Sequence, residues 1–276
     1  MNKTIRFCES TGFYTVNSPT PNPQHPALIL IHGFCEDGSV WDIFRENLSR
    51  RFQVIVPDLP GYRNSSMTKQ ELTMEWLADY IKAIIDKEKI QQPVIIGHSM
   101  GGYIALALAE KFPDVPGKIG LFHSHCFADD DEKKKNRQKA MEFVMKNGTA
   151  DFVNELYDKL FGEKFLKQNK EAVDKLKAAA KKYPAETIAA NLKAMMNRPD
   201  RAHVLKSFRR PVLFILGKQD NAIPYTKSLE QCSFPEISEV HILDDAGHMG
   251  MLEAPKKTLE MVREFVNLNL IIRDTV

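Results

Sequence analysis

The sequence contains few cysteines and almost no excess of charge of either sign. It has 4 cysteines among 276 residues, and 38 basic residues against 36 acidic ones leave a formal net charge of +2. The cysteines, Cys8, Cys35, Cys126 and Cys232, are far apart and form no C-x-x-C pair. This spacing supports neither a compact zinc or redox motif nor a disulfide framework, so we interpret them as reduced thiols. The charge balance provides no attraction to nucleic acid or to an anionic membrane.

Long apolar runs are also missing. No run approaches the roughly 20 residues that a membrane-spanning helix needs. Residues 1–7 alternate between polar and apolar side chains and lack the apolar centre of a signal peptide. We therefore predict a cytoplasmic protein without a nucleic-acid or membrane partner; the sequence does not distinguish a monomer from a homodimer.

The most informative stretch lies near residue 100. Residues 94–96 are β-branched and predict a buried strand, and the small residues of 101–109 predict a buried helix. Between them, Gly97-His98-Ser99-Met100-Gly101 matches G-x-S-x-G, in which a serine on a tight strand-to-helix turn presents its hydroxyl above a sheet. The glycines leave room for such a turn. The alternative is a glycine-rich helix start with an idle serine, and catalytic partners elsewhere in the chain must decide between the two.

Strand and helix patterns alternate on both sides of this stretch. A hairpin is predicted from strands 6–9 and 12–17 around Ser10-Thr11. Four further strands precede residue 126 and two follow residue 207, with helices at 39–50, 73–89, 226–231 and 253–269. This alternation is typical of a mostly parallel sheet flanked by helices, the α/β class.

Residues 127–206 carry only helical patterns, predicted at 129–147, 151–161, 163–182, 185–197 and 200–208. We predict a core domain of residues 1–126 and 207–276, with an all-α cap of residues 127–206 inserted after the sixth strand. Its lysine runs, Lys133-Lys134-Lys135 and Lys181-Lys182, alternate with acids, so we interpret them as a solvated helix face.

Two polar residues follow later strands at the edge where such sheets hold their sites. Asp220 follows the strand that ends at Gly217, and His248 follows the strand that ends at Leu243. A nucleophilic serine needs a base, and the base needs a carboxylate that orients it. We predict Ser99 as nucleophile, His248 as base and Asp220 as acid. Weaker candidates for the acid are Asp244, Asp245, Asp58, Asp114 and Glu36.

An acyl-transfer site also needs donors for the developing oxyanion. The backbone N–H of Met100 follows the nucleophile directly. The second donor is predicted to be the N–H of Phe34, in the loop where Gly33 follows a buried strand.

Five motifs occur in order along nearly the whole chain: His32-Gly33-Phe34, Pro57-Asp58-Leu59-Pro60-Gly61-Tyr62, Gly97-His98-Ser99-Met100-Gly101-Gly102, Gly217-Lys218-Gln219-Asp220 and Ala246-Gly247-His248. In these motifs the chain resembles the α/β-hydrolase-fold proteins, whose triads run in the order serine, acid, histidine. The resemblance implies a serine hydrolase of carboxylic esters or related acyl compounds, with an inserted helical lid. The haloalkane dehalogenases and epoxide hydrolases of this fold carry an aspartate at the position of Ser99, which argues against both activities.

Two other functions fit the same residues. The triad is also suited to hydrolysis of a carbon–carbon bond next to a ketone in a dienoate-like substrate, and the fold also suits a non-catalytic small-molecule receptor. His123 and His125 follow a strand at the site edge and, with Gly33, are possible substrate contacts, whereas His98 is interpreted as packing against the sheet. Three or four converging ligands are needed for a metal, so neither a metal nor a cofactor is predicted.

Overall fold

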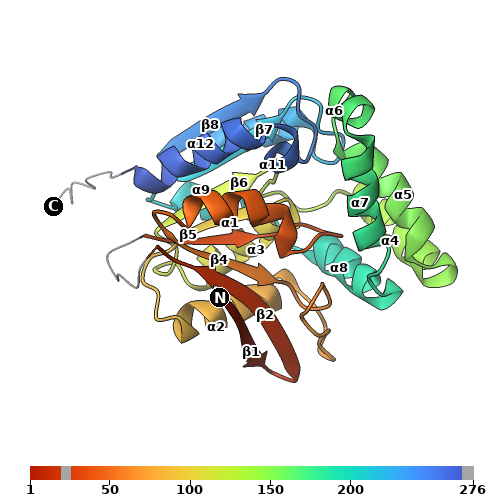
Figure 1. Cartoon of the computed structure of the whole chain (residues 1–276), viewed down its shortest axis with the longest axis horizontal. Coiled ribbons are helices and arrows are strands. Elements are labelled where there is room, and N and C mark those ends of the chain that lie inside the picture. The colour runs from red at the N-terminus through yellow and green to blue at the C-terminus, as the bar shows by residue number, and fades with distance from the viewer. Residues whose placement is uncertain (20–25, 269–276) are drawn as a thin grey trace.

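Eight strands form one sheet in the computed structural model, which describes residues 1–19 and 26–268 (Figure 1). The spatial order is β1-β2-β4-β3-β5-β6-β7-β8, with antiparallel pairing of β1 with β2 and of β2 with β4 and parallel pairing elsewhere. The strands are β1 Asn2–Phe7, β2 Ser10–Asn17, β3 Ala27–Ile31, β4 Gln53–Asp58, β5 Val94–His98, β6 Lys118–Phe122, β7 Val212–Gly217 and β8 Ser238–Leu243. The mostly parallel α/β sheet predicted from the sequence is confirmed.

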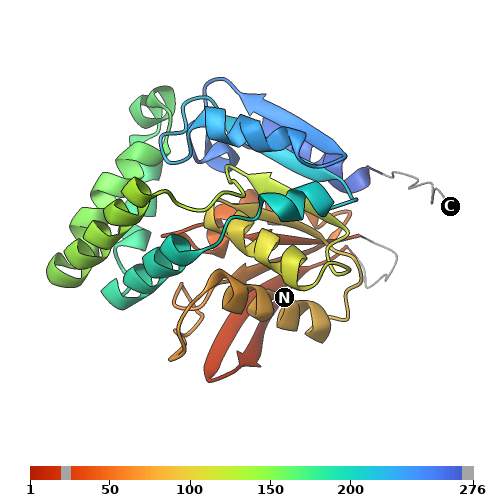
Figure 2. The same cartoon turned by 180° about the vertical axis from the view of Figure 1, so that it is seen from behind.

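Helices cover both faces of the sheet. Helices α1 and α12 lie on one face (Figure 1), and α2, α3 and α10 lie on the other (Figure 2). Their bounds are α1 Asp42–Leu48, α2 Met74–Lys87, α3 Met100–Lys111, α10 Tyr225–Glu230, α11 Gly250–Glu253 and α12 Pro255–Asn267, with 3-10 turns η1 Gly38–Trp41 and η2 Gln231–Ser233. Strands β3, β5 and β7 are buried along their whole length, which explains their continuous apolar sequences.

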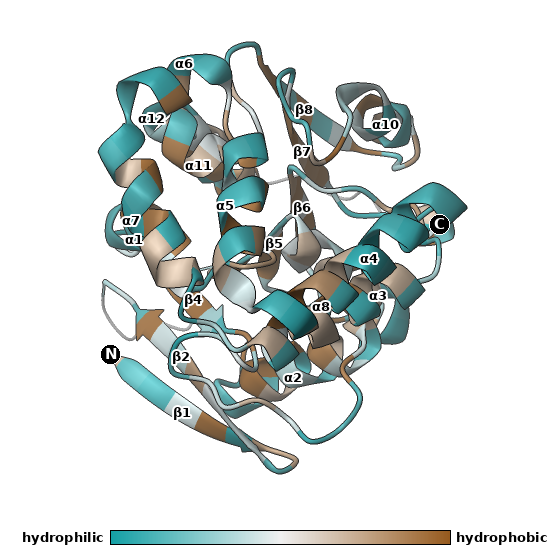
Figure 3. Ribbon diagram, turned by 90° about the vertical axis from the view of Figure 1, so that its right-hand side faces the viewer, coloured by the Kyte–Doolittle hydropathy of each residue, from teal (hydrophilic) through white to brown (hydrophobic). Residues whose placement is uncertain are grey.

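Six helices occupy the interval between β6 and β7. They are α4 Asp131–Asn147, α5 Thr149–Leu160, α6 Glu163–Gln168, α7 Lys170–Ala180, α8 Ala185–Asn197 and α9 Ala202–Ser207. Helices α4 to α8 gather at one side of the sheet (Figure 1), and the view from that side places β5, β6 and β7 behind α4, α5 and α8 (Figure 3). The outward surfaces of α4 and α5 are largely hydrophilic (Figure 3). The division into a core and a separate cap domain stays a prediction.

Two predicted boundaries near the N-terminus were wrong. The hairpin reverses at Cys8 and Glu9 rather than at Ser10-Thr11, because Cys8 adopts the left-handed conformation (φ 53°) that the turn requires. The helix after β3 begins as the 3-10 turn η1, capped by Asp37 instead of Ser39. The Asp37 carboxylate accepts a hydrogen bond from the Ser39 N–H at 2.8 Å.

Two predicted helices are each divided in the structure. The helix predicted over 163–182 breaks at Asn169, which leaves helical geometry (φ −128°, ψ 36°) between α6 and α7. The helix predicted over 253–269 begins at Pro255 instead, and Glu253 is the last residue of the separate helical turn α11. The two are divided at Ala254, because a residue that precedes a proline disfavours helical geometry. The predicted end at Asn269 lies outside the described residues. Among those described, no helix combines the length and apolar character that crossing a membrane requires.

Gly97 in β5 provides a test of the close approach between this strand and α3. A Cβ atom at Gly97 would lie 2.1 Å from the carbonyl carbon of Gly101. We expect Gly97→Ala to lower the free energy of unfolding by about 3 kcal/mol, because backbone on both sides has to move. Chemical denaturation of the purified variant measures this loss.

Gly148, in the turn between α4 and α5, is the matched control. It has positive φ (82°) but open space around its Cβ position. Gly148→Ala therefore loses about 2 kcal/mol, from backbone strain alone, because its positive φ combined with ψ −179° is a region that glycine alone adopts readily. Equal losses in the two variants would contradict the steric explanation.

Candidate active site

Ser99 lies in a strained turn between β5 and α3. Its backbone angles are φ 49° and ψ −113°, a conformation that residues other than glycine rarely adopt, and α3 begins at the next residue, Met100. The turn is held from β6: the Ser99 N–H donates to the Phe122 carbonyl at 3.0 Å, and the Ser124 hydroxyl donates to the Ser99 carbonyl at 2.7 Å. The predicted strand-to-helix turn is therefore present, with Ser99 at its tip.

His248 and Asp220 form a buried hydrogen-bonded pair after β8 and β7. His248 Nδ1 lies 2.7 Å from Asp220 Oδ2, and Asp220 Oδ1 accepts hydrogen bonds from the N–H groups of Ala222 at 2.9 Å and Ile223 at 2.8 Å. Burial alone would raise the pKa of Asp220, but the charge of His248, the hydrogen bond from His248 and the nearby His123 ring hold that pKa well below its usual value. Asp220 is thus ionised and orients the imidazole through Nδ1, leaving Nε2 for other chemistry.

Ser99 and His248 line the same cavity, which has a volume of about 160 Å³. Its walls are mainly apolar: Phe34, Phe152, Leu156, Leu160, Leu192, Met195, Ala222 and Ile223 line it, together with the polar residues Glu36, Ser99, Tyr103, Lys133, Arg137 and His248. A larger hollow of about 730 Å³ beside α6 is lined by neither Ser99 nor His248. The structure therefore brings Ser99 and His248 to one small cavity, and Asp220 is hydrogen-bonded to His248.

Both predicted oxyanion donors are close to this cavity. Met100 is the first residue of α3, so its N–H has no intrahelical acceptor. Phe34 lines the cavity, and its amide has no hydrogen-bond acceptor within the described ranges 1–19 and 26–268. Gly33 does not line the cavity, and its N–H donates to Glu36 Oε2 at 2.9 Å.

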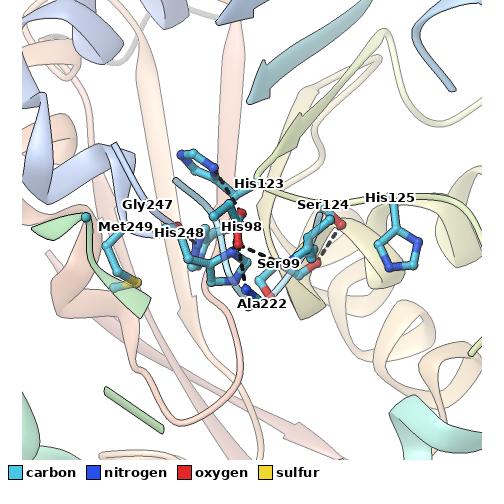
Figure 4. A network of polar contacts seen from close by, with 12 residues as sticks. His98, Ser99, His123, Ser124, His125, Ala222, Gly247, His248 and Met249 are labelled. Carbon is cyan, nitrogen blue, oxygen red and sulfur yellow. Dashed lines mark hydrogen bonds and ion pairs between the residues drawn. The ribbon is translucent and has the colours of Figure 1, made fainter. Parts of the chain in front are cut away.

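His123 and His125 lie on different sides of Ser124 (Figure 4). Neither lines the cavity, so their role as substrate contacts stays a prediction. The His125 Nε2 is 3.3 Å from the Tyr103 hydroxyl, and its ring stacks on Phe127.

His123 is buried beside the acid, with Nδ1 3.4 Å from Asp220 Oδ2, and burial lowers its pKa to about 4. In the described part of the chain neither of its ring nitrogens has a hydrogen-bond partner. One ring nitrogen of His123, one ring nitrogen of His248 and one carboxylate oxygen of Asp220 lie within 4.8 Å of one another; these are atoms of the kinds that coordinate metal ions. The 2.7 Å separation of His248 Nδ1 and Asp220 Oδ2 is that of a charge-assisted hydrogen bond.

The sequence reasoning missed the importance of Glu36 and His98. Glu36 is buried, lines the cavity and lies 3.0 Å from His98 Nδ1, while His98 Nε2 lies 2.8 Å from the His248 carbonyl. Both ring nitrogens of His98 thus face acceptors, an arrangement that only the doubly protonated imidazolium satisfies. Burial opposes the charge of each group, but the partner's charge prevails: the pKa of His98 is raised and the pKa of Glu36 is lowered.

The interpretation of Lys133-Lys134-Lys135 as a solvated face was wrong for one residue. Lys134 and Lys135 are exposed, whereas Lys133 is half-buried and lines the cavity with Arg137. The helical spacing of Lys133, Arg137 and Val144, which face inward on α4, was the signal that could have revealed this. Among the apolar residues in and directly after α5, Phe152 and Leu156 line the cavity, whereas Phe161 stacks on Phe165.

Comparison with known proteins agrees with the fold. A family model described as alpha/beta hydrolase fold matches residues 26–255. The chain belongs to this family.

The relatives include hydrolases with named activities. A curated relative, the pimeloyl-[acyl-carrier protein] methyl ester esterase of Aeromonas hydrophila, is 26% identical over 261 residues, covering 88% of this chain and 96% of that protein. A solved thermophilic esterase from Thermogutta terrifontis is 27% identical with a TM-score of 0.89, covering 96% of this chain and 98% of its own. An enol-lactonase from Burkholderia xenovorans, at 20% identity, TM-score 0.89 and coverage of 96% and 100%, shares the fold. The chain is an esterase-like hydrolase.

The buried Glu36–His98 pair predicts a pH-dependent contribution to stability. The raised pKa of His98 makes its stabilisation complete below its ordinary value of 6.5 and lost as the pH rises through the raised value. The lowered pKa of Glu36 makes its stabilisation complete above 4.5 and lost as the pH falls through the lowered value. The pair is therefore most stabilising between these two ordinary values.

A double-mutant cycle of Glu36→Gln and His98→Asn measures this contribution. At pH 5.5 we expect a coupling free energy of about 2 kcal/mol in urea unfolding, declining at alkaline pH as the imidazolium loses its proton. A coupling that is constant from pH 5.5 to pH 9 contradicts the assignment of an ion pair.

Proposed function

We propose that the chain hydrolyses carboxylic esters of small molecules through Ser99, His248 and Asp220. The observation that carries the proposal is the cavity shared by Ser99 and His248, with His248 oriented from behind by the buried Asp220 carboxylate. The esterase-like relatives support the same reaction class.

The first half of the reaction transfers the acyl group to the protein. His248 takes the proton of the Ser99 hydroxyl through Nε2 while the hydroxyl oxygen attacks the ester carbonyl carbon. The N–H groups of Phe34 and Met100 donate to the carbonyl oxygen as it becomes negative. The tetrahedral intermediate then expels the alcohol, which receives the proton from His248, and an acyl ester on Ser99 remains.

The second half returns the protein to its starting state. His248 takes a proton from water, whose oxygen attacks the acyl carbonyl, and the same two amides stabilise the oxyanion. The bond to Ser99 breaks, the serine regains its proton from the imidazolium, and the carboxylic acid leaves. Asp220 stays ionised throughout and stabilises the charge on His248.

Removal of the nucleophile tests this proposal directly. We expect Ser99→Ala to reduce kcat for 4-nitrophenyl butyrate by at least about a thousandfold and to abolish labelling by a fluorophosphonate probe. Ser233→Ala, an exposed serine on η2, is the matched control and retains full activity. Undiminished turnover in Ser99→Ala excludes Ser99 as the nucleophile.

The orienting role of the acid makes a separate prediction. Asp220→Asn retains an oxygen for the amides of Ala222 and Ile223 but no longer stabilises the imidazolium of His248. We expect kcat to fall by about 10⁴-fold while the midpoint of thermal unfolding changes little. Circular dichroism and steady-state kinetics on the same sample separate a catalytic loss from a folding loss.

Three further statements belong to this proposal. Residues 127–206 act as a cap over a core of residues 1–126 and 207–276, since side chains of α4, α5 and α8 line the cavity. The reaction needs no cofactor, and the location is cytoplasmic. Carbon–carbon bond hydrolysis and a receptor role use the same residues but gain no support from any contact among the described residues, so ester hydrolysis is the function proposed.

A further inference from the structure

Helix α4 brings two cationic side chains to the cavity. Lys133 and Arg137 are one turn apart, both line the cavity that Ser99 and His248 also line, and the Arg137 side chain is only 14% exposed. A solvated lysine and arginine would extend from the outer face of the helix, as the neighbouring Lys134 does. The placement of two cations in a largely apolar cavity of an ester-cleaving protein calls for a physical reason.

The cations around this end of the cavity outnumber their carboxylate partners. Arg137 forms an ion pair with Asp129, and Arg198 forms a second with the same carboxylate at 2.8 Å. Lys133 has only the Ala222 carbonyl oxygen, 3.3 Å from Nζ, and pairs with no carboxylate among residues 1–19 and 26–268. Burial, followed by the charge of Arg137, lowers the pKa of Lys133 to about 8. The Lys133 ammonium is thus partly desolvated and lacks a counter-ion.

Other charges near the cavity do not balance this excess. Glu36 lines the cavity, but its carboxylate is bound by the His98 imidazolium and the Gly33 N–H. The pKa of the buried His125 is held well below its ordinary value by burial and by the charges of Arg198 and Lys133, among others. The field at the α4 side of the cavity is therefore positive.

We infer that Lys133 binds a carboxylate of the substrate, so that the ester cleaved at Ser99 carries a second, anionic group. The inference rests on the proposed function and adds the substrate class: esters of dicarboxylic acids with one free carboxylate, or esters whose alcohol part carries it. The carboxylate completes the ion pair that Lys133 lacks, with Arg137 adjacent. The apolar residues Phe152 and Leu156 contact the carbon chain.

Matched pairs of substrates isolate the effect of the free carboxylate of the ester. Monomethyl succinate, glutarate and adipate are compared with methyl butyrate, pentanoate and hexanoate, which have the same numbers of acyl carbons and no free carboxylate. A second arm compares 4-carboxyphenyl butyrate with phenyl butyrate, which moves the carboxylate to the alcohol part. In one of the two arms we expect kcat/KM to be at least about tenfold higher for the anionic member of a pair than for its uncharged partner. A difference of this size corresponds to one additional charge-assisted hydrogen bond.

Variants of one helix identify the residue responsible. Lys133→Met keeps the length of the side chain and removes the charge, Lys133→Arg restores a cation, and the exposed Lys134→Met is the control. We expect Lys133→Met to abolish the preference for the anionic substrate, measured as the ratio of the two kcat/KM values within each pair. Lys133→Arg restores most of the preference, and Lys134→Met changes neither value.

The outcomes separate this inference from the proposed function. If uncharged and anionic esters are hydrolysed equally well, or if Lys133→Met slows both alike, the carboxylate site is wrong and the esterase proposal stands. If the wild type hydrolyses none of these esters, the proposed function fails on this panel. Calorimetric titration with monomethyl glutarate and uncharged methyl pentanoate then decides the inference: monomethyl glutarate binding that Lys133→Met abolishes supports the site, and equal or absent binding of both overturns it.

Discussion

The structure depends on one strained residue at the end of its central strand. Ser99 holds a backbone conformation with φ 49°, which is maintained because β6 and α3 fix the chain on both sides of it. Helix α3 lies so close to β5 and to the end of β3 that neither Gly97 nor Gly101 has space for a side chain. The strain is offset by the packing of the whole sheet, and in return the hydroxyl has one defined position at the carboxyl edge. Strands β7 and β8 end at that same edge, and the loops that follow them bring Asp220 and His248 into place.

Buried charge is the second organising feature of the site. Asp220 is ionised because two backbone amides and the neighbouring imidazole replace the water that it loses. Glu36 and His98 form a second buried pair, and its imidazolium holds the backbone carbonyl of His248. His248 is therefore held at two points, by the Asp220 carboxylate on its ring and by a hydrogen bond from His98 to its main-chain carbonyl. Such fixed dipoles and charges need little reorganisation during a reaction, which is how electrostatic catalysis works.

The sequence predicted most of the fold because its signals are local. Continuous apolar runs marked the strands that are buried on both faces, and helical spacing marked α2, α8 and α12 within a few residues. The break at Asn169 and the turn at Cys8 were missed because neither position is a glycine or a proline, the residues that usually mark such sites. The site was predicted where a motif positions a residue, as for Ser99, Asp220 and His248. Glu36 and Lys133 were missed as members of the cavity wall, because their positions follow from contacts between segments 62 and 89 residues apart in the chain.

Two hydrogen bonds join helix α5 to the loop that carries His248 and to the loop that carries Phe34. The N–H of His248 donates to the carbonyl of Leu160 at 2.6 Å, and the hydroxyl of Tyr157 donates to the carbonyl of Cys35, next to Phe34, at 2.7 Å. An outward movement of this helix would break both bonds and release the loops that carry His248 and Phe34 together. A substrate that enters without breaking these two bonds must therefore pass around α5, past α3, α4 or α8, which also contribute side chains to the cavity. Helix α5 therefore both lines the cavity and supports the two loops that carry His248 and Phe34.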